Sequence, residues 1–314
     1  MNKFKVVVKK ISPFVSKYKW SFFGAILFII SAAVFTAIAP RTEGLIITRL
    51  TKDFSEIIKG VTGASVNFNY IVKVLIILFF VYLSSAGSTF IASFLLTNAI
   101  QNTMMDIRKA VKSKISKLPI RYFDSHSYGD VLSRITNDVD TISNALQQSF
   151  VQVINAILSI VLALIMMYSI NIKLALLATL IIPLSLIITK IIVNKSQNLF
   201  NKQQEALGKL NGRVQELYTG FNEIKLYGKE KDALKDFMEA NEELRSMGFR
   251  AQFISSIMSP LVSLVSYLGI ALVGITGAIT AISGGITVGN LQAFIRYIWQ
   301  INQPLSQVTQ LSSA

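Results

Sequence analysis

The sequence contains no cysteine and only one histidine in 314 residues. Without cysteine the chain has no disulfide, no thiolate metal site and no cysteine nucleophile. The single histidine, His126, excludes a metal site made of several histidines from one chain, and its polar neighbours favour solvent exposure over metal binding. We therefore predict no catalytic residue and no metal-binding residue in this chain.

Charged residues are also scarce, at 15% of the chain against roughly a quarter in an average soluble domain. Hydrophobic residues make up 52%, which argues against a soluble enzyme and against a disordered chain. The charges are unbalanced, with 31 Lys and Arg against 17 Asp and Glu, a formal charge of +14. In a soluble protein this excess indicates nucleic-acid binding, whereas in a membrane protein it is expected beside the anionic cytoplasmic face.

Long stretches of the sequence carry no charge, and the stretch 251–295 is too long for one membrane crossing. A membrane-spanning helix needs roughly 20 mostly apolar residues. Two glycines at Ser283-Gly284-Gly285 permit a tight turn that divides this stretch into two spans. The sequence predicts an all-α membrane protein with six transmembrane helices, near residues 20–40, 74–100, 146–169, 173–194, 253–282 and 287–314.

The Lys and Arg residues gather in three segments. Residues 1–19 hold six lysines, 101–145 hold seven Lys or Arg, and 190–250 hold eleven. Because cytoplasmic segments carry the positive excess, we predict cytoplasmic N and C termini and loops, in the plasma membrane of a bacterium. Residues 1–19 are predicted to be a basic interfacial segment. Topology accounts for the basic charge, so no nucleic-acid partner is expected.

The two long cytoplasmic loops, 101–145 and 195–250, carry apolar residues at helical spacing. In the second loop a heptad-like spacing predicts a packed seam. We expect the membrane helices to continue into the cytoplasm and to reverse near Pro119 and Gly228. Channels and secondary transporters rarely need such levers, whereas a machine driven by a soluble partner does. The predicted seam consists of Leu207, Leu210, Val214, Leu217, Phe221 and Ile224.

Four motifs carry a resemblance to a known family. They are LPIRYFD at 118–124, GDVLSRITNDV at 129–139, the segment 216–230 that ends in IKLYGKE, and the turn ISGGITVGNLQAF at 282–294. In this order and spacing the chain resembles the transmembrane domain of type I ABC exporters, the multidrug and lipid-exporter-like class. The resemblance covers essentially residues 1–314, as a single transmembrane domain.

The resemblance implies that the loop tips form coupling helices, near 122–130 and 225–233, which lie across an ATP-binding domain. It also implies a second transmembrane domain, in a homodimer or a heterodimer, with ATP and Mg bound by the nucleotide-binding domain. The residues that match the coupling regions are Tyr122, Phe123, Asp124, Tyr128, Gly129, Lys225, Tyr227, Gly228, Lys229 and Glu230.

The chain lacks the P-loop spacing GxxxxGK[ST], whose backbone amides hold phosphates. Gly208-Lys209 and Gly228-Lys229 both lack the earlier glycine and the following Ser or Thr. We therefore expect no ATP hydrolysis by this chain alone and no cofactor bound to it. The ATPase is expected either in a truncated part of the protein or in a separate polypeptide, and a chain end inside the sixth span favours truncation.

The predicted sixth span has one polar face, and the third span has a shorter one. Polar groups are costly in lipid and should face protein or water, so a water-filled pathway and a hydrogen-bonded bundle interior are both compatible. For the sixth span we favour the pathway. The candidate pathway residues are Gln292, Arg296, Gln300, Gln303, Gln307 and Gln310, with Gln152 and Asn155 in the third span.

Arg296 is the most informative of these candidates about function, because its guanidinium keeps its charge. The predicted spans contain no Asp or Glu, and Glu43, just beyond Pro40, is the nearest. We therefore expect Arg296 to lack a carboxylate partner at its own depth and to face the central cavity, where it could favour anionic substrates. The alternative is a position near a membrane edge or a helix crossing, with hydrogen bonds to backbone carbonyls.

The sequence thus predicts the membrane-spanning half of an ATP-driven ABC exporter that forms a translocation pathway by alternating access as a dimer. Its partners would be the lipid bilayer, a second transmembrane domain, a nucleotide-binding domain and a small-molecule, lipid or peptide substrate. The alternatives are a secondary transporter, which would need intramembrane carboxylates, and a non-transporting scaffold that uses the cytoplasmic levers for docking.

Overall fold

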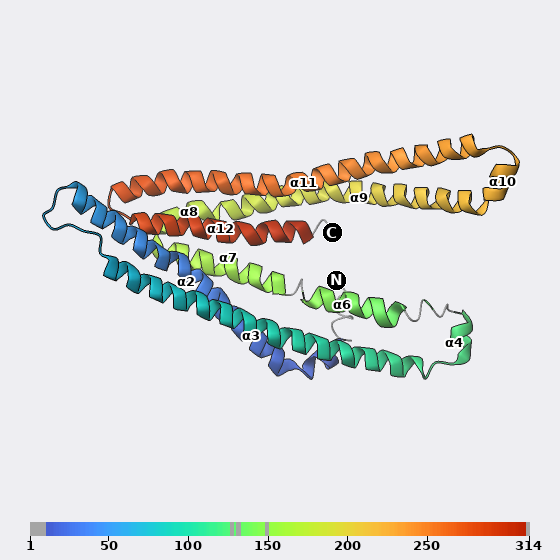
Figure 1. The fold of residues 1–314 in the computed structure, drawn as a ribbon, viewed down its shortest axis with the longest axis horizontal. Helices are drawn as coiled ribbons and strands as arrows, with labels where there is room; N and C mark the ends of the chain where they lie inside the picture. The colour runs from blue at the N-terminus through green and yellow to red at the C-terminus, as the bar shows by residue number, and fades with distance from the viewer. Residues whose placement is uncertain (1–10, 126–128, 130–132, 148–150, 312–314) are drawn as a thin grey trace. The chain divides into compact units, whose positions relative to one another are not determined.

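The computed structural model describes residues 11–125, 129, 133–147 and 151–311. Within these ranges the chain is helical and has no strand (Figure 1). Most of it forms two compact units, 1–172 with 276–300 and 173–275 with 301–314. The long helices are α2 (Lys19–Ile58), α3 (Phe68–Ile115), α7 (Val151–Ile170), α9 (Ile181–Thr219), α11 (Glu230–Ile282) and α12 (Val288–Leu311), and the short ones are α4 (Ile120–Ser125), η1 (Arg134–Asp138), α6 (Val139–Ala145), α8 (Ile172–Thr179) and α10 (Phe221–Leu226).

Among the described helices, five are long and apolar enough to cross a membrane. They are α2, α3, α7, the segment Ile172–Thr219 formed by α8 and α9, and α11. Helix α12 is not among them, because glutamines and Arg296 interrupt its apolar residues. That α12 forms a sixth span stays a prediction. Of the predicted interfacial segment, residues 1–10 lie outside the described part of the chain, as does His126.

Helix α2 runs through Pro40 without ending. Proline removes one backbone donor, a loss that membrane helices tolerate when nearby groups satisfy the backbone. On either side of Pro40, the Thr36 hydroxyl donates to the Ala32 carbonyl at 2.9 Å and the Thr42 hydroxyl to the Ile38 carbonyl at 3.2 Å. These bonds go to carbonyls of the neighbouring turns and not to the Thr36 carbonyl that proline leaves without its helical donor. The helix nevertheless continues to Ile58, well past the predicted end of the first span at residue 40.

Helices α2 and α3 lie side by side as an antiparallel pair in the first unit (Figure 1). The turn that joins them is held by the Asp53 carboxylate, which is 1% exposed. It accepts the Asn67 backbone N–H at 2.8 Å and pairs with Arg49 at 3.0 Å. The Asn67 side chain in turn caps α3 by accepting the Tyr70 N–H at 2.9 Å. A buried carboxylate near the end of α2 thus fixes the residue that caps the start of α3.

The core of the first unit also includes Val139, at the start of α6. Val139 is buried with Leu96, Ile100 and Met104 of α3, and Ala25 of α2 completes the cluster. Helix α3 has 48 residues and extends to Ile115, whereas a span requires roughly 20. This length agrees with the predicted continuation of the membrane helices beyond the bilayer.

Helix α12 approaches α2 closely at two glycines. A Cβ atom on Gly44 would lie 2.5 Å from the carbonyl oxygen of Gly289, so neither helix has room for a side chain here. Thr48 donates to Thr287 at 3.0 Å on one side of this crossing. On the other side, the buried Tyr297 hydroxyl donates to the Ala37 carbonyl at 2.8 Å. This contact sets the register between the two helices within the first unit.

The turn from α11 to α12 agrees with the predicted break at 283–285. Gly284 has φ 80°, a conformation that favours glycine, and the Gly285 N–H donates to the Thr280 carbonyl at 2.8 Å.

In the second unit, α9 and α11 are joined through α10. Helix α9 begins at Ile181, directly after the break at Leu180, and Pro183 falls in its first turn, where a missing N–H costs no helical hydrogen bond. Gly269 of α11 leaves space for the Ile181 side chain, since a Cβ there would collide with it.

The close crossing predicts the effect of one added methyl group. Gly44→Ala should lower the free energy of unfolding by about 1–3 kcal/mol, because the methyl would overlap a backbone carbonyl. The measurement is thermal unfolding in detergent. Gly212→Ala is the matched control: its Cβ would meet nothing within 4 Å, so stability should hold or rise slightly through helix propensity. Equal stability of the two variants would contradict the crossing.

Candidate functional site

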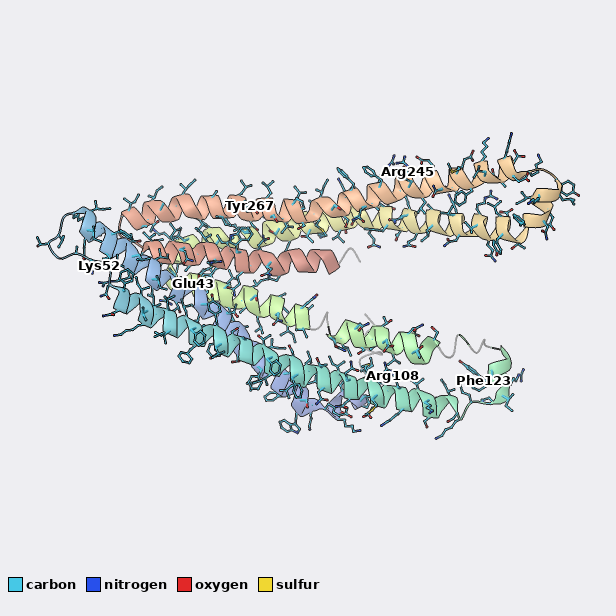
Figure 2. The ribbon with its side chains drawn as sticks, in the orientation of Figure 1. Glu43, Lys52, Arg108, Phe123, Arg245 and Tyr267 are labelled. Atoms are coloured by element: carbon cyan, nitrogen blue, oxygen red, sulfur yellow. The ribbon has the colours of Figure 1, made fainter. Side chains whose placement is uncertain are left out.

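Three polar side chains from α3 and α12 meet around Glu43 of α2 in the first unit. The Tyr82 hydroxyl of α3 donates to Glu43 Oε1 at 2.6 Å. On the other carboxylate oxygen, Oε2, the Gln292 amide donates at 3.4 Å and Arg296 Nε lies at 3.5 Å. Figure 2 labels Glu43 on α2. We call these residues, Glu43, Tyr82, Gln292 and Arg296, the Glu43 cluster.

The prediction that Arg296 lacks a carboxylate at its own depth is wrong. It placed Glu43 outside the first span because the uncharged stretch ends at Pro40, directly before Arg41. Since α2 continues through Pro40, Glu43 lies less than one helical turn beyond it and reaches Arg296 of α12. Sequence analysis also missed Tyr82, one of several hydroxyl residues in α3, because only its contact with Glu43 distinguishes it from the others.

The other predicted pathway residues differ in their surroundings. Gln303, Gln152 and Asn155 are exposed. The amide oxygens of Gln292 and Gln300 are buried and, within the described part of the chain, accept no hydrogen bond. Buried acceptors in this state call for water, a ligand or another chain. The side chains of Gln307 and Gln310 lie outside the described set.

Asn302 is a buried polar residue that sequence analysis did not select. Its side chain is 5% exposed, and its amide oxygen has no hydrogen-bond partner among the described residues. It lies on α12 two residues after Gln300 and therefore off the predicted glutamine face. Asn302 was therefore not part of any set of polar residues at helical spacing, which is the pattern by which the other pathway residues were selected.

The first predicted coupling region contains the short helix α4. Tyr122 and Phe123 are partly buried, with their ring centroids 5.8 Å apart at an interplanar angle of 88°, and Figure 2 labels Phe123 on this helix. The backbone of Asp124 is helical, and Gly129 is exposed. Tyr128 and the side chain of Asp124 lie outside the described residues. The described part of this helix covers Ile120–Ser125, and the rest of the predicted range 122–130 lies outside the described residues except for Gly129, whose backbone is helical.

Charged contacts connect the helices behind this tip. Arg108 of α3 forms an ion pair with Asp140 of α6. Farther along α3, Asp106 accepts hydrogen bonds from Lys17 at 2.8 Å and from the Tyr18 hydroxyl at 3.0 Å. The hydrogen bond with Asp106 raises the pKa of Lys17. These contacts lie on exposed surfaces, where single ion pairs contribute little to stability.

The second short helix, α10, lies earlier than the predicted range 225–233. It covers Phe221–Leu226, and the chain then turns at Gly228 with φ 63°. Lys225 lies over the Phe221 ring at 5.7 Å, and Lys229 pairs with Asp232 at 2.8 Å. Tyr227 is 75% exposed, and Glu230 begins α11. The tip therefore presents aromatic and aliphatic surface next to charged side chains.

The predicted seam of the second extension packs on one of its two columns. Leu210, Leu217 and Ile224, seven residues apart, are partly buried. Leu207, Val214 and Phe221 form the other column and are exposed, Phe221 by 59%. The prediction of a fully packed seam is therefore wrong for this second column.

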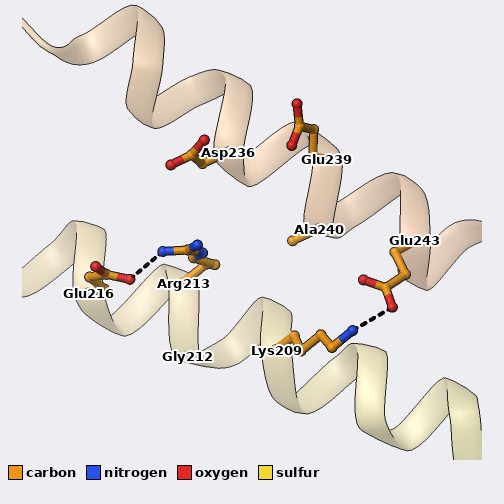
Figure 3. Close-up of a pocket in the computed structure, with 8 residues that line it drawn as sticks. All are labelled: Lys209, Gly212, Arg213, Glu216, Asp236, Glu239, Ala240 and Glu243. Carbon is orange, nitrogen blue, oxygen red and sulfur yellow. Dashed lines mark hydrogen bonds and ion pairs between the residues drawn. The ribbon is translucent and has the colours of Figure 1, made fainter.

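Charged side chains line the space between α9 and α11 (Figure 3). Lys209 and Glu243 connect the two helices at 2.7 Å, while Arg213 pairs with Glu216 on its own helix at 2.8 Å. The hydrogen bond to Glu243 raises the pKa of Lys209. The groups are solvated, so we assign them to the pairing of the helices. Across the described residues, no group of metal-ligating side chains is present.

Neither Gly-Lys pair has the geometry of a nucleotide site. Gly208 lies within α9, and Lys209 is engaged with Glu243. Gly228 lies in the tight turn after α10, and Lys229 is engaged with Asp232. A P-loop requires a glycine-rich loop at the start of a helix. Neither pair fits the phosphates of ATP.

These helices define an all-helical integral membrane protein, and comparison with known proteins identifies its family. The chain belongs to the ABC transporter transmembrane region family, whose model matches residues 22–305. The resemblance to exporter transmembrane domains and the predicted all-α fold are thereby confirmed.

Three relatives show how much of a transporter this chain represents. It is 36% identical over 264 residues to the fatty acid ABC transporter ATP-binding/permease protein of Mycobacterium bovis, covering 83% of this chain and 42% of that protein. It is 27% identical over 304 residues to an uncharacterized ABC transporter ATP-binding protein of Bacillus subtilis, covering 97% and 48%. For the ATP-dependent lipid A-core flippase of Dechloromonas aromatica the identity is 27% over 233 residues, covering 74% and 40%. The chain spans less than half the length of each.

The two columns of the seam predict effects of different size for substitution by asparagine. Leu217→Asn should lower the free energy of unfolding by about 1 kcal/mol, because it removes partly buried apolar surface. Phe221→Asn, on the exposed column, should change it little. Thermal unfolding of both variants in detergent measures the difference. Greater destabilisation by Phe221→Asn would mean that the outer column is the packed one.

Proposed function

We propose that the chain is the membrane-spanning half of an ATP-driven exporter, which works as a dimer by alternating access. ATP and Mg would be bound and hydrolysed by a nucleotide-binding domain or subunit. Membership in the ABC transporter transmembrane family supports this proposal, as do the relatives that combine ATP-binding with permease function in their names.

The observation that carries the proposal is the length of the helices. Helix α3 has 48 residues, α9 has 39 and α11 has 53. A 30 Å hydrocarbon layer needs roughly 20 residues. The remaining turns extend beyond this layer. Helix α3 leads to the short helix α4, and α9 and α11 are joined by the short helix α10. Rigid extensions of this length suit the transmission of motion from an ATPase to a membrane pathway.

The distribution of Lys and Arg supports an orientation with both extensions and both termini in the cytoplasm. In the cytoplasm both tips would contact the nucleotide-binding domain. The first tip carries Tyr122 and Phe123, and the second carries Tyr227. Tyr227 and Leu226 are 75% and 79% exposed. Exposed apolar side chains of this kind at a polar tip indicate a contact with another protein.

The polar face of α12 supports a pathway along this helix. Arg296 has a side chain that is 61% exposed in the single chain. A guanidinium facing lipid is costly, so the exposed surface should face water or protein. In a dimer that encloses a central cavity, both requirements are met when Arg296 faces that cavity.

We propose an amphiphile with an acyl chain as the cargo. The relatives named above include a fatty acid transporter and a lipid A-core flippase. A pathway that joins a polar face on α12 to largely apolar helices can contact both parts of such a molecule.

Charge at either tip should uncouple ATP hydrolysis from transport. Phe123→Asp or Tyr227→Asp in the complete transporter should reduce ATP-driven transport at least tenfold, because a carboxylate in an apolar contact loses its hydration. The measurements are transport into proteoliposomes, ATPase rate and thermal stability. Met238→Asp is the control: it is 57% exposed but lies roughly 12 Å along α11 from Glu230.

Two outcomes would contradict this proposal. Normal coupling in both tip variants would exclude the tips as contacts. Transport that persists without ATP and follows an ion gradient would support a secondary transporter instead.

Accessibility at position 296 tests the pathway. The chain has no native cysteine, so Arg296→Cys gives a single reactive site. We expect a membrane-impermeant thiol reagent to label it in at least one nucleotide state and amphiphilic cargo to slow the labelling. Asn155→Cys, on the other predicted polar face, serves for comparison. Protection of residue 296 in every nucleotide state would place Arg296 outside the pathway.

A further inference from the structure

We propose that Glu43 sets the charge selectivity of the pathway by holding one edge of the Arg296 guanidinium, while the other edge binds the carboxylate or phosphate of an anionic amphiphile. Glu43 would be a positioning residue and a competing anion. This inference rests on the proposed function, because it assumes that Arg296 faces the pathway.

The Glu43 carboxylate is held independently of Arg296. Its Oε1 atom accepts the Tyr82 hydroxyl at 2.6 Å, and its Oε2 atom accepts the Gln292 amide at 3.4 Å. Its side chain is 25% exposed. Glu43 therefore keeps hydrogen bonds to both oxygens when Arg296 turns toward another anion, so the carboxylate is not left unpaired.

Arg296 is held more loosely than its partner. Its contact with Glu43 is a single approach by Nε at 3.5 Å, longer than a strong charge-assisted hydrogen bond. Within the described part of the chain, no other ion pair of Arg296 is present. The guanidinium has five N–H donors in a planar fork, and its side chain is 61% exposed. The edge formed by its two terminal nitrogens is thus available to a ligand.

A carboxylate or a phosphate fits this edge with two parallel hydrogen bonds, which an alcohol or an ester lacks. Glu43 lies on the adjacent edge and repels the incoming anion. The pair is neutral without cargo, which lowers the cost of keeping Arg296 in the membrane. The same repulsion weakens anion binding and favours release. Glu43 would thereby lower the affinity for the anionic cargo and raise the rate at which the cargo is released.

Tyr82 allows a test in which two substitutions act in opposite directions. Glu43→Gln removes the competing charge but keeps the size of the side chain, so anions should bind more tightly. Tyr82→Phe removes the hydroxyl that holds Oε1 and frees Glu43 to pair more closely with Arg296, so anions should bind more weakly. Non-specific damage would weaken binding in both variants.

The experiment measures binding to the complete transporter in phosphatidylcholine nanodiscs without ATP, using oleate, oleyl phosphate and the neutral oleyl alcohol. Glu43→Gln should lower the dissociation constant for oleate about tenfold, equivalent to about 1.4 kcal/mol, and leave that for oleyl alcohol unchanged. Tyr82→Phe should raise the oleate constant several-fold. Arg296→Gln should remove the preference for oleate over the alcohol.

Each arm of the experiment decides a separate point. An oleate affinity that Glu43→Gln leaves unchanged, or a shift of equal size for oleate and alcohol, would overturn the role of Glu43. Comparison of oleate with oleyl phosphate identifies the headgroup that the fork prefers. Binding that follows these expectations without any ATP-driven transport would contradict the proposed function and leave the selectivity of the Glu43 cluster intact.

Discussion

The charge on Arg296 has to be met by an opposite charge or by water, because a guanidinium does not lose its proton in proteins. In the first unit this need is met by Glu43, and the arrangement of three helices serves it. Helix α2 must continue through Pro40 to present the carboxylate, α3 must supply Tyr82, and α12 must lie close enough for Gln292 and Arg296 to reach it.

The close approach of α2 and α12 has a simple steric basis. At Gly44 and Gly289 the two backbones are nearly in contact. Hydrogen bonds on both sides of this point involve Thr48 with Thr287 and Tyr297 with Ala37. Small residues that permit close contact, together with polar residues that hydrogen-bond across it, are the usual means by which helices associate in membranes. Glu43 adjoins Gly44 and Gln292 lies three residues after Gly289, so their contact depends on the register of this crossing.

Much of the fold was predictable from periodicity and composition. The apolar stretches predicted the long helices, the two glycines predicted the turn before α12, and the seam predicted that α9 would extend far beyond a bilayer. The site was less accessible. Arg296 and Gln292 stand out because they are polar in an apolar context, whereas Glu43 lies beside Pro40, Arg41 and Thr42 and resembles the polar end of a span. The exposed column with Phe221 was mispredicted for a related reason: spacing shows that residues share a stripe, and a neighbouring helix decides which part of the stripe is covered.

By itself the sequence determined the class of protein, because apolar length, the distribution of basic residues and the order of local motifs depend on the chain alone. It also determined that this chain carries no P-loop. Tertiary structure decided that Arg296 has a partner, since Glu43 and Arg296 are far apart in the sequence and meet only through the crossing of α2 and α12. It also decided how far α2 extends, because a proline inside a helix ends it or not according to whether the groups around it satisfy the backbone.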